Sequence, residues 1–304
     1  MQGSQTKIPL EKRLFHELHR KNIRSPSIKE FNECWAFSNT VRSHFKRGDF
    51  DVVIDVAGGQ GCLAALFLIL ASAKRAVVID PAEVGQNSVD KAWHGFYEGK
   101  DLIYRHECLR TALGDELDKT LNEMGVPPSR ILVVACHACQ HLSDETLEIV
   151  CNYGVHAAVM PCCQKDLDGS SWKALGKRLG INFASLMDIL MAGKVMAWNT
   201  GKEAGVSYQV RMKAIDEKIT PQNRIILCKA LTLNNSISPA NQAKILAHEK
   251  LKRAYSRAHS HPKKTKGVSY PFTFSSKDFC VKNFVIGLTA GIVLSNLPLL
   301  RHRG

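Results

Sequence analysis

Residues 51–62 read DVVIDVAGGQGC, a short run rich in β-branched residues that passes into three closely spaced glycines. β-Branched side chains favour a strand, and glycines allow the sharp turn that brings backbone N–H groups close to a ligand. The next residues, 62–73, are almost entirely apolar and predict a buried helix, and residues 76–80 predict a second strand. Strand, turn, helix and strand in this order form a βαβ unit, which predicts a parallel sheet.

The rest of the sheet is predicted from further short apolar runs. These are residues 102–105, 131–135, 157–160, 207–215 and 223–229. The first three are separated by helical stretches and extend the parallel sheet, whereas the last two predict a closing antiparallel pair. We therefore expect a Rossmann-like, doubly wound α/β domain with seven strands over residues 50–232.

Residues 1–49 are predicted to be helical. Leu10, Leu14 and Leu18 recur every four residues, which is the spacing of one face of a helix. A second helix is expected to begin after Ser27, its N-cap, and to end near Gly48. These helices can cover an edge of the sheet or contact a substrate.

Length and composition describe an ordinary globular chain. It has 304 residues, of which 45% are apolar and 23% charged, and this excludes a collagen-like or wholly disordered protein. Ten cysteines are too few for a disulfide scaffold in a chain of this length, so we expect mostly free thiols and a reducing compartment.

Charge is unevenly distributed along the chain. Residues 1–50 carry 10 basic and 5 acidic side chains, residues 51–170 carry 9 and 17, and residues 171–304 carry 22 and 6, which makes +5, −8 and +16 and sums to the net charge of +13. Basic flanks of this kind indicate a phosphate-bearing partner, either RNA or an anionic membrane surface. A solvated basic surface without a partner is the alternative interpretation.

The chain after residue 232 is expected to have two parts. Residues 233–275 predict a basic helix and linker, with eight Lys or Arg and one Glu between residues 244 and 266. Residues 276–304 include 17 uncharged residues from Phe284 to Leu300, the shortest length that crosses a bilayer core of ~30 Å. We expect either a tail anchor in an intracellular membrane, with the domain facing the cytoplasm, or a buried helix in a soluble cytoplasmic protein.

Two cofactors suit the glycine turn. NAD would use the G-x-G-x-x-A pattern of residues 59–64, with Asp80 on the ribose. S-adenosylmethionine is favoured by Asp55, because a carboxylate beside the turn attracts an ammonium group and repels a pyrophosphate. In addition, no Tyr is followed four residues later by Lys, so the common dehydrogenase pair is absent from the sequence. The residues expected to hold the cofactor are Asp55, Ala57, Gly58, Gly59, Gly61 and Asp80.

Cysteines and a histidine follow two of the expected strands. Residues 136–141 read CHACQH, and residues 160–164 read MPCCQ. Three interpretations stay open: a zinc site, a cysteine nucleophile that attacks a pyrimidine ring, or small side chains packed at the strand ends. For methylation of a hydroxyl group, His137 is the expected base, and Cys139, Cys162 and Cys163 are expected to line the acceptor site.

The combination of these motifs resembles a known enzyme family. The motifs that carry the resemblance are residues 55–61, VIDP at residues 78–81, CHAC at residues 136–139 followed by Asp144, MPCC at residues 160–163 and ITPQNR at residues 219–224. Together they are similar to a family of class I methyltransferases that includes the acceptor-stem tRNA ribose 2′-O-methyltransferases. The resemblance implies a Rossmann-like methyltransferase fold, S-adenosylmethionine as the methyl donor and RNA as a substrate.

The sequence therefore predicts an S-adenosylmethionine-dependent methyltransferase whose preferred acceptor is RNA, with tRNA among the candidates. The alternatives are a membrane-tethered protein or small-molecule methyltransferase, and a cofactor-binding adaptor without turnover. Two features depart from the tRNA enzymes: Gln140 stands where relatives often carry Gly or Asp, and residues 1–49 contain no accessory zinc module. The sequence makes no prediction of the oligomeric state.

Overall fold

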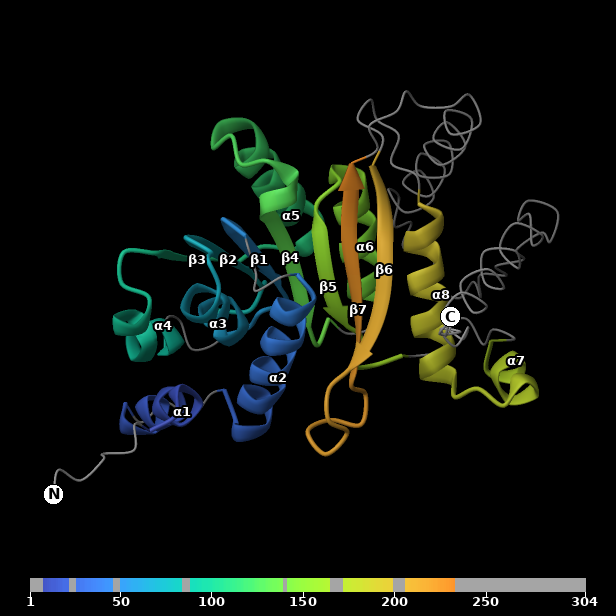
Figure 1. Ribbon diagram of the computed structural model, residues 1–304, viewed down its shortest axis with the longest axis horizontal. Coiled ribbons are helices and arrows are strands. Elements are labelled where there is room, and N and C mark those ends of the chain that lie inside the picture. Colours follow the sequence, from blue (N-terminus) through green and yellow to red (C-terminus); the bar gives the residue numbers. More distant parts are fainter. Residues whose placement is uncertain are drawn as a thin grey trace, which may run out of the picture.

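Seven strands form one sheet in the order β3-β2-β1-β4-β5-β7-β6 (Figure 1). The computed structural model describes residues 8–21, 26–45, 50–83, 88–138, 141–164, 172–198 and 206–232. The strands are β1 (Val52–Val56), β2 (Arg75–Ile79), β3 (Asp101–Arg105), β4 (Ile131–Cys136), β5 (His156–Met160), β6 (Val206–Ala214) and β7 (Arg224–Thr232). The first five run parallel, and β7 is antiparallel to both β5 and β6.

The predicted fold class is confirmed. All seven predicted strands are present, and most of their ends agree within one residue, although β7 continues three residues further than expected. The strand order reverses between β1 and β4, since β2 and β3 lie on one side of β1 and β4 and β5 lie on the other. This arrangement is that of a doubly wound α/β domain.

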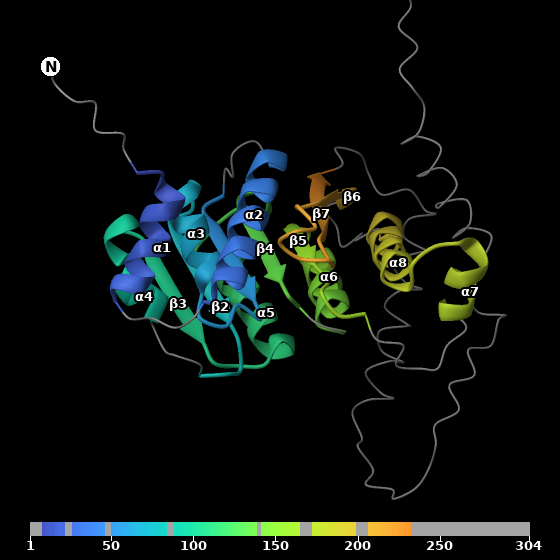
Figure 2. The same ribbon diagram turned by 90° about the horizontal axis from the view of Figure 1, so that it is seen from below.

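Helices cover both faces of the sheet (Figure 2). On one face lie α1 (Leu10–Arg20), α2 (Ile28–His44), α3 (Cys62–Leu70) and α4 (Ser88–Trp93), and on the other lie α5 (Leu109–Asp118), α6 (His141–Tyr153) and α8 (Phe183–Ala197). The short α7 (Trp172–Leu179) packs against α8.

The central strands are buried along their whole length because helices lie on both sides of them. Successive residues of a strand point to opposite faces, so Val53 joins the core on the α2 and α3 side, and Ile54 joins the core on the α5 and α6 side. Burial of each such side chain contributes ~1.5–3 kcal/mol to stability. The β-branched run that predicts β1 therefore supplies both cores.

Ser27 caps α2, as predicted. Its Oγ accepts a hydrogen bond from the Glu30 N–H at 3.2 Å, and the Glu30 carboxylate accepts one from the Ser27 N–H at 2.7 Å. This reciprocal pair satisfies two donors at the start of the helix. Phe31 and Phe37 of α2 then pack in the same core as β1 and α3, so the N-terminal helices and the sheet share one core. The predicted helix end at Gly48 lies outside the described residues.

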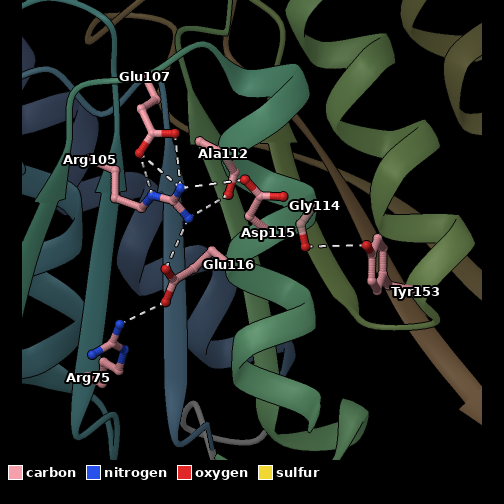
Figure 3. Close-up of polar contacts among 8 residues, drawn as sticks. All are labelled: Arg75, Arg105, Glu107, Ala112, Gly114, Asp115, Glu116 and Tyr153. Atoms are coloured by element: carbon pink, nitrogen blue, oxygen red, sulfur yellow. Dashed lines mark hydrogen bonds and ion pairs between the residues drawn. The ribbon is translucent and has the colours of Figure 1, made fainter. Parts of the chain in front are cut away.

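An ion network joins α5 to the strands β2 and β3 (Figure 3). The Glu116 carboxylate, which is 2% exposed, lies 2.8 Å from Arg75 Nη2 and 3.4 Å from Arg105 Nη1. Arg105 also donates to the Glu107 carboxylate at 2.9–3.0 Å. The buried carboxylate is thus paired with two guanidinium groups, and the end of β3 is held against α5.

Within the described residues, no single helix is long and apolar enough to cross a membrane, and only α7 with α8 meets that criterion, as a pair bent by 104°. The predicted basic segment 233–275 and the candidate anchor 276–304 lie outside the part of the chain that the structure describes.

His156 begins β5 as a buried, neutral histidine. Its ring packs against Phe45 and Phe50, with centroids 5.3 Å and 6.0 Å away. Its Nδ1 accepts a hydrogen bond from the Ala230 N–H at 3.0 Å. Burial, followed by the charge of Lys229, lowers the pKa of His156 from 6.5 to about 4.

We expect acid to destabilise the fold through His156. Between pH 6.5 and 4 the unfolded chain binds a proton at this residue and the folded chain does not, so the free energy of unfolding falls by up to ~1.4 kcal/mol per pH unit. Above pH 6.5 and below pH 4 the folded and unfolded chains have the same protonation at this residue, so its contribution no longer changes with pH.

Urea unfolding at two pH values, roughly 7.5 and 5, checks this expectation. His156→Gln should lose ~2 kcal/mol less than the wild type on acidification, whereas His16→Gln, at an exposed position of α1, should lose as much as the wild type. Equal losses in the wild type and His156→Gln would contradict the account.

Candidate functional site

The predicted site residues that the structure describes lie at one edge of the sheet. Because β1, β2, β4 and β5 are parallel, the segments that follow them meet at their common carboxyl ends. These segments contain the glycine turn, Asp80, His137 and the pair Cys162 and Cys163. Ligands of doubly wound sheets bind at this edge, where the strand order reverses. Cys139 lies outside the described residues.

The turn between β1 and α3 depends on left-handed backbone conformations. Gly59 and Gly61 have φ of +52° and +78°, and Ala57, which is not a glycine, has φ of +54°. The Ala57 N–H donates to the Ile79 carbonyl of β2 at 2.8 Å, which fixes the start of the turn against the neighbouring strand. A non-glycine residue in this region is strained, and such strain concentrates at functional sites.

The three glycines of the turn serve different purposes. A Cβ on Gly58 would lie 2.6 Å from the Asp55 carboxyl group, and a Cβ on Gly61 would lie 2.7 Å from the Tyr104 hydroxyl. These two glycines therefore allow the turn to pack closely against the protein. A Cβ on Gly59 would have no atom within 4 Å, so Gly59 faces open space. A ligand can approach the backbone on that side.

Asp80 connects the turn to the end of β2. Its Oδ2 accepts a hydrogen bond from the Gly59 N–H at 3.0 Å, and its Oδ1 accepts one from the Ala82 N–H at 2.9 Å. The Asp80 N–H in turn donates to the Arg105 carbonyl of β3 at 3.2 Å. A carboxylate offers about four acceptor positions, so the two that remain can accept from the hydroxyls of a ribose.

Asp55 lies beneath the turn and is only 1% exposed. Its Oδ2 accepts a hydrogen bond from the Ala64 N–H of α3 at 3.1 Å. Burial raises the pKa of Asp55 well above its usual value, and Cys34 raises it further, while the Ala64 N–H opposes both. A cation bound beside the turn would favour the ionised carboxylate. The structure therefore places Asp55 where it supports the turn and can respond to a positive ligand group.

His137 contacts a carboxylate that the sequence did not single out. His137 follows β4 with φ of +71°, and its Nε2 lies 2.9 Å from Oε2 of Glu33 on α2. Glu33 is 1% exposed, whereas the His137 side chain is 31% exposed. Glu33 precedes the buried Phe37 by four residues, so an acidic residue on the apolar face of the predicted helix is the signal that would have found it. Nε2 of His137 and Oε2 of Glu33 are within ion-pair distance, but Nε2 of His137 makes no hydrogen bond within the described residues.

A thiol cluster lies under this part of the site. Cys34 of α2, Cys62 of α3 and Cys136 of β4 are all buried, and the Cys34 thiol interacts with the other two. Burial raises the pKa of the Cys62 thiol well above its usual value. Among the described residues no group of three or more His, Cys, Asp or Glu is arranged to hold a metal ion. Cys136 packs in the core, and the three interpretations of the cysteines as a group stay predictions.

The segment after β5 is held by a buried carboxylate. Asp188 of α8, which is 1% exposed, accepts from Gln164 Nε2 at 2.9 Å and from Arg224 Nε at 2.6 Å. Burial raises the pKa of Asp188, and its two partners oppose the shift. Cys162 and Cys163 precede Gln164 and have sulfur atoms 3.5 Å apart, with Cys163 exposed. Attack by one of these thiolates on a pyrimidine stays a prediction.

Residues 28–170 match a family model described as a methyltransferase domain. The match covers slightly less than half of the chain. It begins with α2, which carries Glu33, and it includes the glycine turn, Asp80, His137 and the cysteine pair. The domain match supports the methyltransferase interpretation of these residues, and it leaves the methyl acceptor open.

Several solved structures are similar to this chain at low sequence identity and low TM-score. An O-methyltransferase family protein from Burkholderia thailandensis has 14% identity and a TM-score of 0.40, and the alignment covers 72% of this chain and 62% of that one. An rRNA methylase from Streptococcus thermophilus has 12% identity and a TM-score of 0.34, with 68% and 99% covered. Magnesium protoporphyrin IX methyltransferase from Synechocystis PCC 6803, with bound SAH, has 12% identity and a TM-score of 0.39, with 73% and 95% covered. No curated protein matches the sequence significantly.

Gly59→Val tests the turn as the cofactor site. The new side chain would occupy the open side of the turn, so we expect binding of S-adenosylmethionine to weaken by at least roughly tenfold, or ~1.4 kcal/mol. Equilibrium dialysis with the labelled cofactor measures this change.

Gly99→Val is the matched control for this variant. Gly99 also has a positive φ, of +77°, and a Cβ at this position would likewise have no atom within 4 Å. It precedes β3 at the opposite edge of the sheet, so its substitution should leave cofactor binding unchanged. If Gly59→Val binds the cofactor as tightly as Gly99→Val, the assignment of the turn is wrong.

Proposed function

We propose that this chain is a methyltransferase that uses S-adenosylmethionine as methyl donor and RNA as its preferred acceptor. The observation that carries the proposal is the hydrogen bond from the Gly59 N–H to the Asp80 carboxylate. This bond holds the glycine turn, with its open side outward, near the point where the strand order of the sheet reverses. The domain match over residues 28–170 supports the same activity.

The residues around the turn suit S-adenosylmethionine. Asp80 has acceptor positions left for the two ribose hydroxyls, and the uncovered side of Gly59 leaves room for the ligand to contact the backbone. When bound, this cofactor supplies a methyl group on a positively charged sulfur. Asp55 lies beneath the turn, where a carboxylate favours such a cation over the pyrophosphate of NAD, whereas Asp80 suits the ribose of either cofactor.

The proposed role of His137 is to accept the proton of the acceptor hydroxyl. Its imidazole is partly exposed at the edge of the sheet, which lets it touch an incoming acceptor. Glu33 lies against the Nε2 side of the ring, so the proton of the acceptor would pass to the other ring nitrogen, Nδ1. Glu33 is in this role a positioning residue. The other residues of the candidate site would mainly position the acceptor oxygen in line with the methyl group.

RNA is proposed as the acceptor from the charge of the chain. The flanks of the acidic central region carry +5 and +16 by formal charge, and the basic stretch between residues 244 and 266 follows the domain in the sequence. Lysines and arginines along a chain neutralise phosphates and make binding sensitive to salt. A membrane-tethered enzyme acting on proteins or small molecules, or an adaptor without turnover, would be the conclusion if RNA accepts no methyl group.

Label transfer tests the proposed function. The full chain is incubated with S-adenosylmethionine labelled in the methyl group and with a total cell extract, and the products are treated with RNase or with protease. We expect label that RNase removes and protease does not. His137→Asn should lower transfer by ~10²–10⁴-fold while dialysis shows unchanged cofactor binding, because only the acceptor proton is affected. Label that only protease removes, or bound cofactor without transfer, would overturn RNA as the acceptor.

A further inference from the structure

One face of the β6–β7 hairpin carries a group of cationic side chains. Side chains alternate along a strand, and on one face Tyr208 and Val210 of β6 pack in the core that includes α8. The opposite face presents Arg211 and Lys213 from β6 and Lys229 from β7. In Figure 1 α8 lies beside the hairpin, and α2 packs against the β7 part of the face that carries the cations. We call Arg211, Lys213 and Lys229 the hairpin cations.

The strand register brings the hairpin cations together. Gln209 pairs with Lys229, Arg211 pairs with Leu227, and the next position on the same face of β6 is Lys213. Diagonal neighbours on one face of a sheet lie ~7–8 Å apart, within reach of one another's long side chains. Lys213 Nζ also reaches Ser43 Oγ at the end of α2, 3.5 Å away. The cations thus form one surface that continues from the hairpin to α2.

The surface concentrates positive charge. His44 of α2 lies beside the hairpin cations, and its pKa is lowered first by burial and then by the charges of Lys213, Arg211 and Lys229. Within the described residues no carboxylate forms an ion pair with any of the three cations. Arg75, by contrast, is paired with Glu116. Unbalanced positive charge on a surface attracts an anionic partner.

The position of the surface relates it to the candidate site. β6 runs parallel to β5, so Ala214 and its partner Arg224 lie at the carboxyl edge of the sheet, next to the segment after β5. The turn that follows β6 carries the exposed Asp216, Glu217 and Lys218. An anionic chain on the hairpin face would therefore run beside the site edge.

We propose that the hairpin cations bind the phosphate backbone of the acceptor RNA and align it with the site at the carboxyl edge. This inference rests on the proposed function, because it takes RNA as the acceptor. Apart from Leu231, the solvent-accessible side chains of this face are the three cations and the polar Ser207 and Gln209. A surface that inserts into a membrane presents several apolar side chains, and this face presents one, so the composition favours a polyanion in water.

Fluorescence anisotropy with a labelled single-stranded RNA of 20 mixed nucleotides tests the proposal. The hairpin variant is the full chain with Arg211→Gln, Lys213→Gln and Lys229→Gln. It should bind the RNA at least roughly tenfold more weakly at 0.1 M salt, and its plot of log affinity against log salt concentration should be less steep by ~2. The matched control is Lys12→Gln, Lys91→Gln and Lys119→Gln, which removes the same charge from exposed positions of α1, α4 and the end of α5. The control should bind within about twofold of the wild type. Thermal unfolding and cofactor dialysis check that both variants are folded.

Three outcomes would overturn the proposal. In the first, the hairpin variant binds RNA as tightly as the wild type. In the second, the control variant loses as much RNA affinity as the hairpin variant. In the third, the hairpin variant loses binding to phosphatidylserine vesicles but keeps its RNA affinity. Label transfer to RNA by the wild type is measured separately, so the two proposals can fail independently. If the wild type methylates RNA but the hairpin variant binds RNA normally, only the proposed binding surface is wrong. If the hairpin variant binds RNA more weakly but the wild type transfers no label, only the proposed function is wrong.

Discussion

The hydrogen bond from the Gly59 N–H to the Asp80 carboxylate is the contact on which the site depends. It joins the ends of β1 and β2, and it holds the glycine turn with its open side outward. Asp80 is itself held from β3, because its N–H donates to the carbonyl of Arg105, whose guanidinium is fixed by Glu116 and Glu107. The ion network on α5 therefore supports the cofactor side of the site through the backbone of β3 (Figure 3).

The N-terminal helices complete the acceptor side. α2 shares a core with the sheet and brings Glu33 to His137 and Cys34 to the thiol cluster. Asp188 has a corresponding role at the segment after β5, which it connects to α8 and β7. Both are buried carboxylates beside a partly exposed polar group, and such pairs help to keep side chains in place where an acceptor would bind.

The sheet and the cofactor turn could be predicted from sequence because their signals are local. The β-branched run and the glycines lie within residues 51–62, and Asp80 ends the next strand. Glu33 could not be paired with His137 in this way, since the contact joins a helix and a strand end that are far apart in the sequence. The hairpin cations likewise depend on a register, Gln209 opposite Lys229, that no local pattern specifies. The left-handed conformation of Ala57, whose N–H donates to β2, is likewise not specified by any local pattern.

Calorimetric titration of the full chain with S-adenosylhomocysteine and, separately, with NAD tests the central claim most directly. The hydrogen bond between Gly59 and Asp80 predicts one bound S-adenosylhomocysteine per chain and weaker binding in Asp80→Asn, and the Asp55 carboxylate beneath the turn predicts no binding of NAD. Asn at position 80 keeps the size of the side chain and removes its charge. Binding of NAD without binding of S-adenosylhomocysteine would contradict the account and make the turn a dinucleotide site.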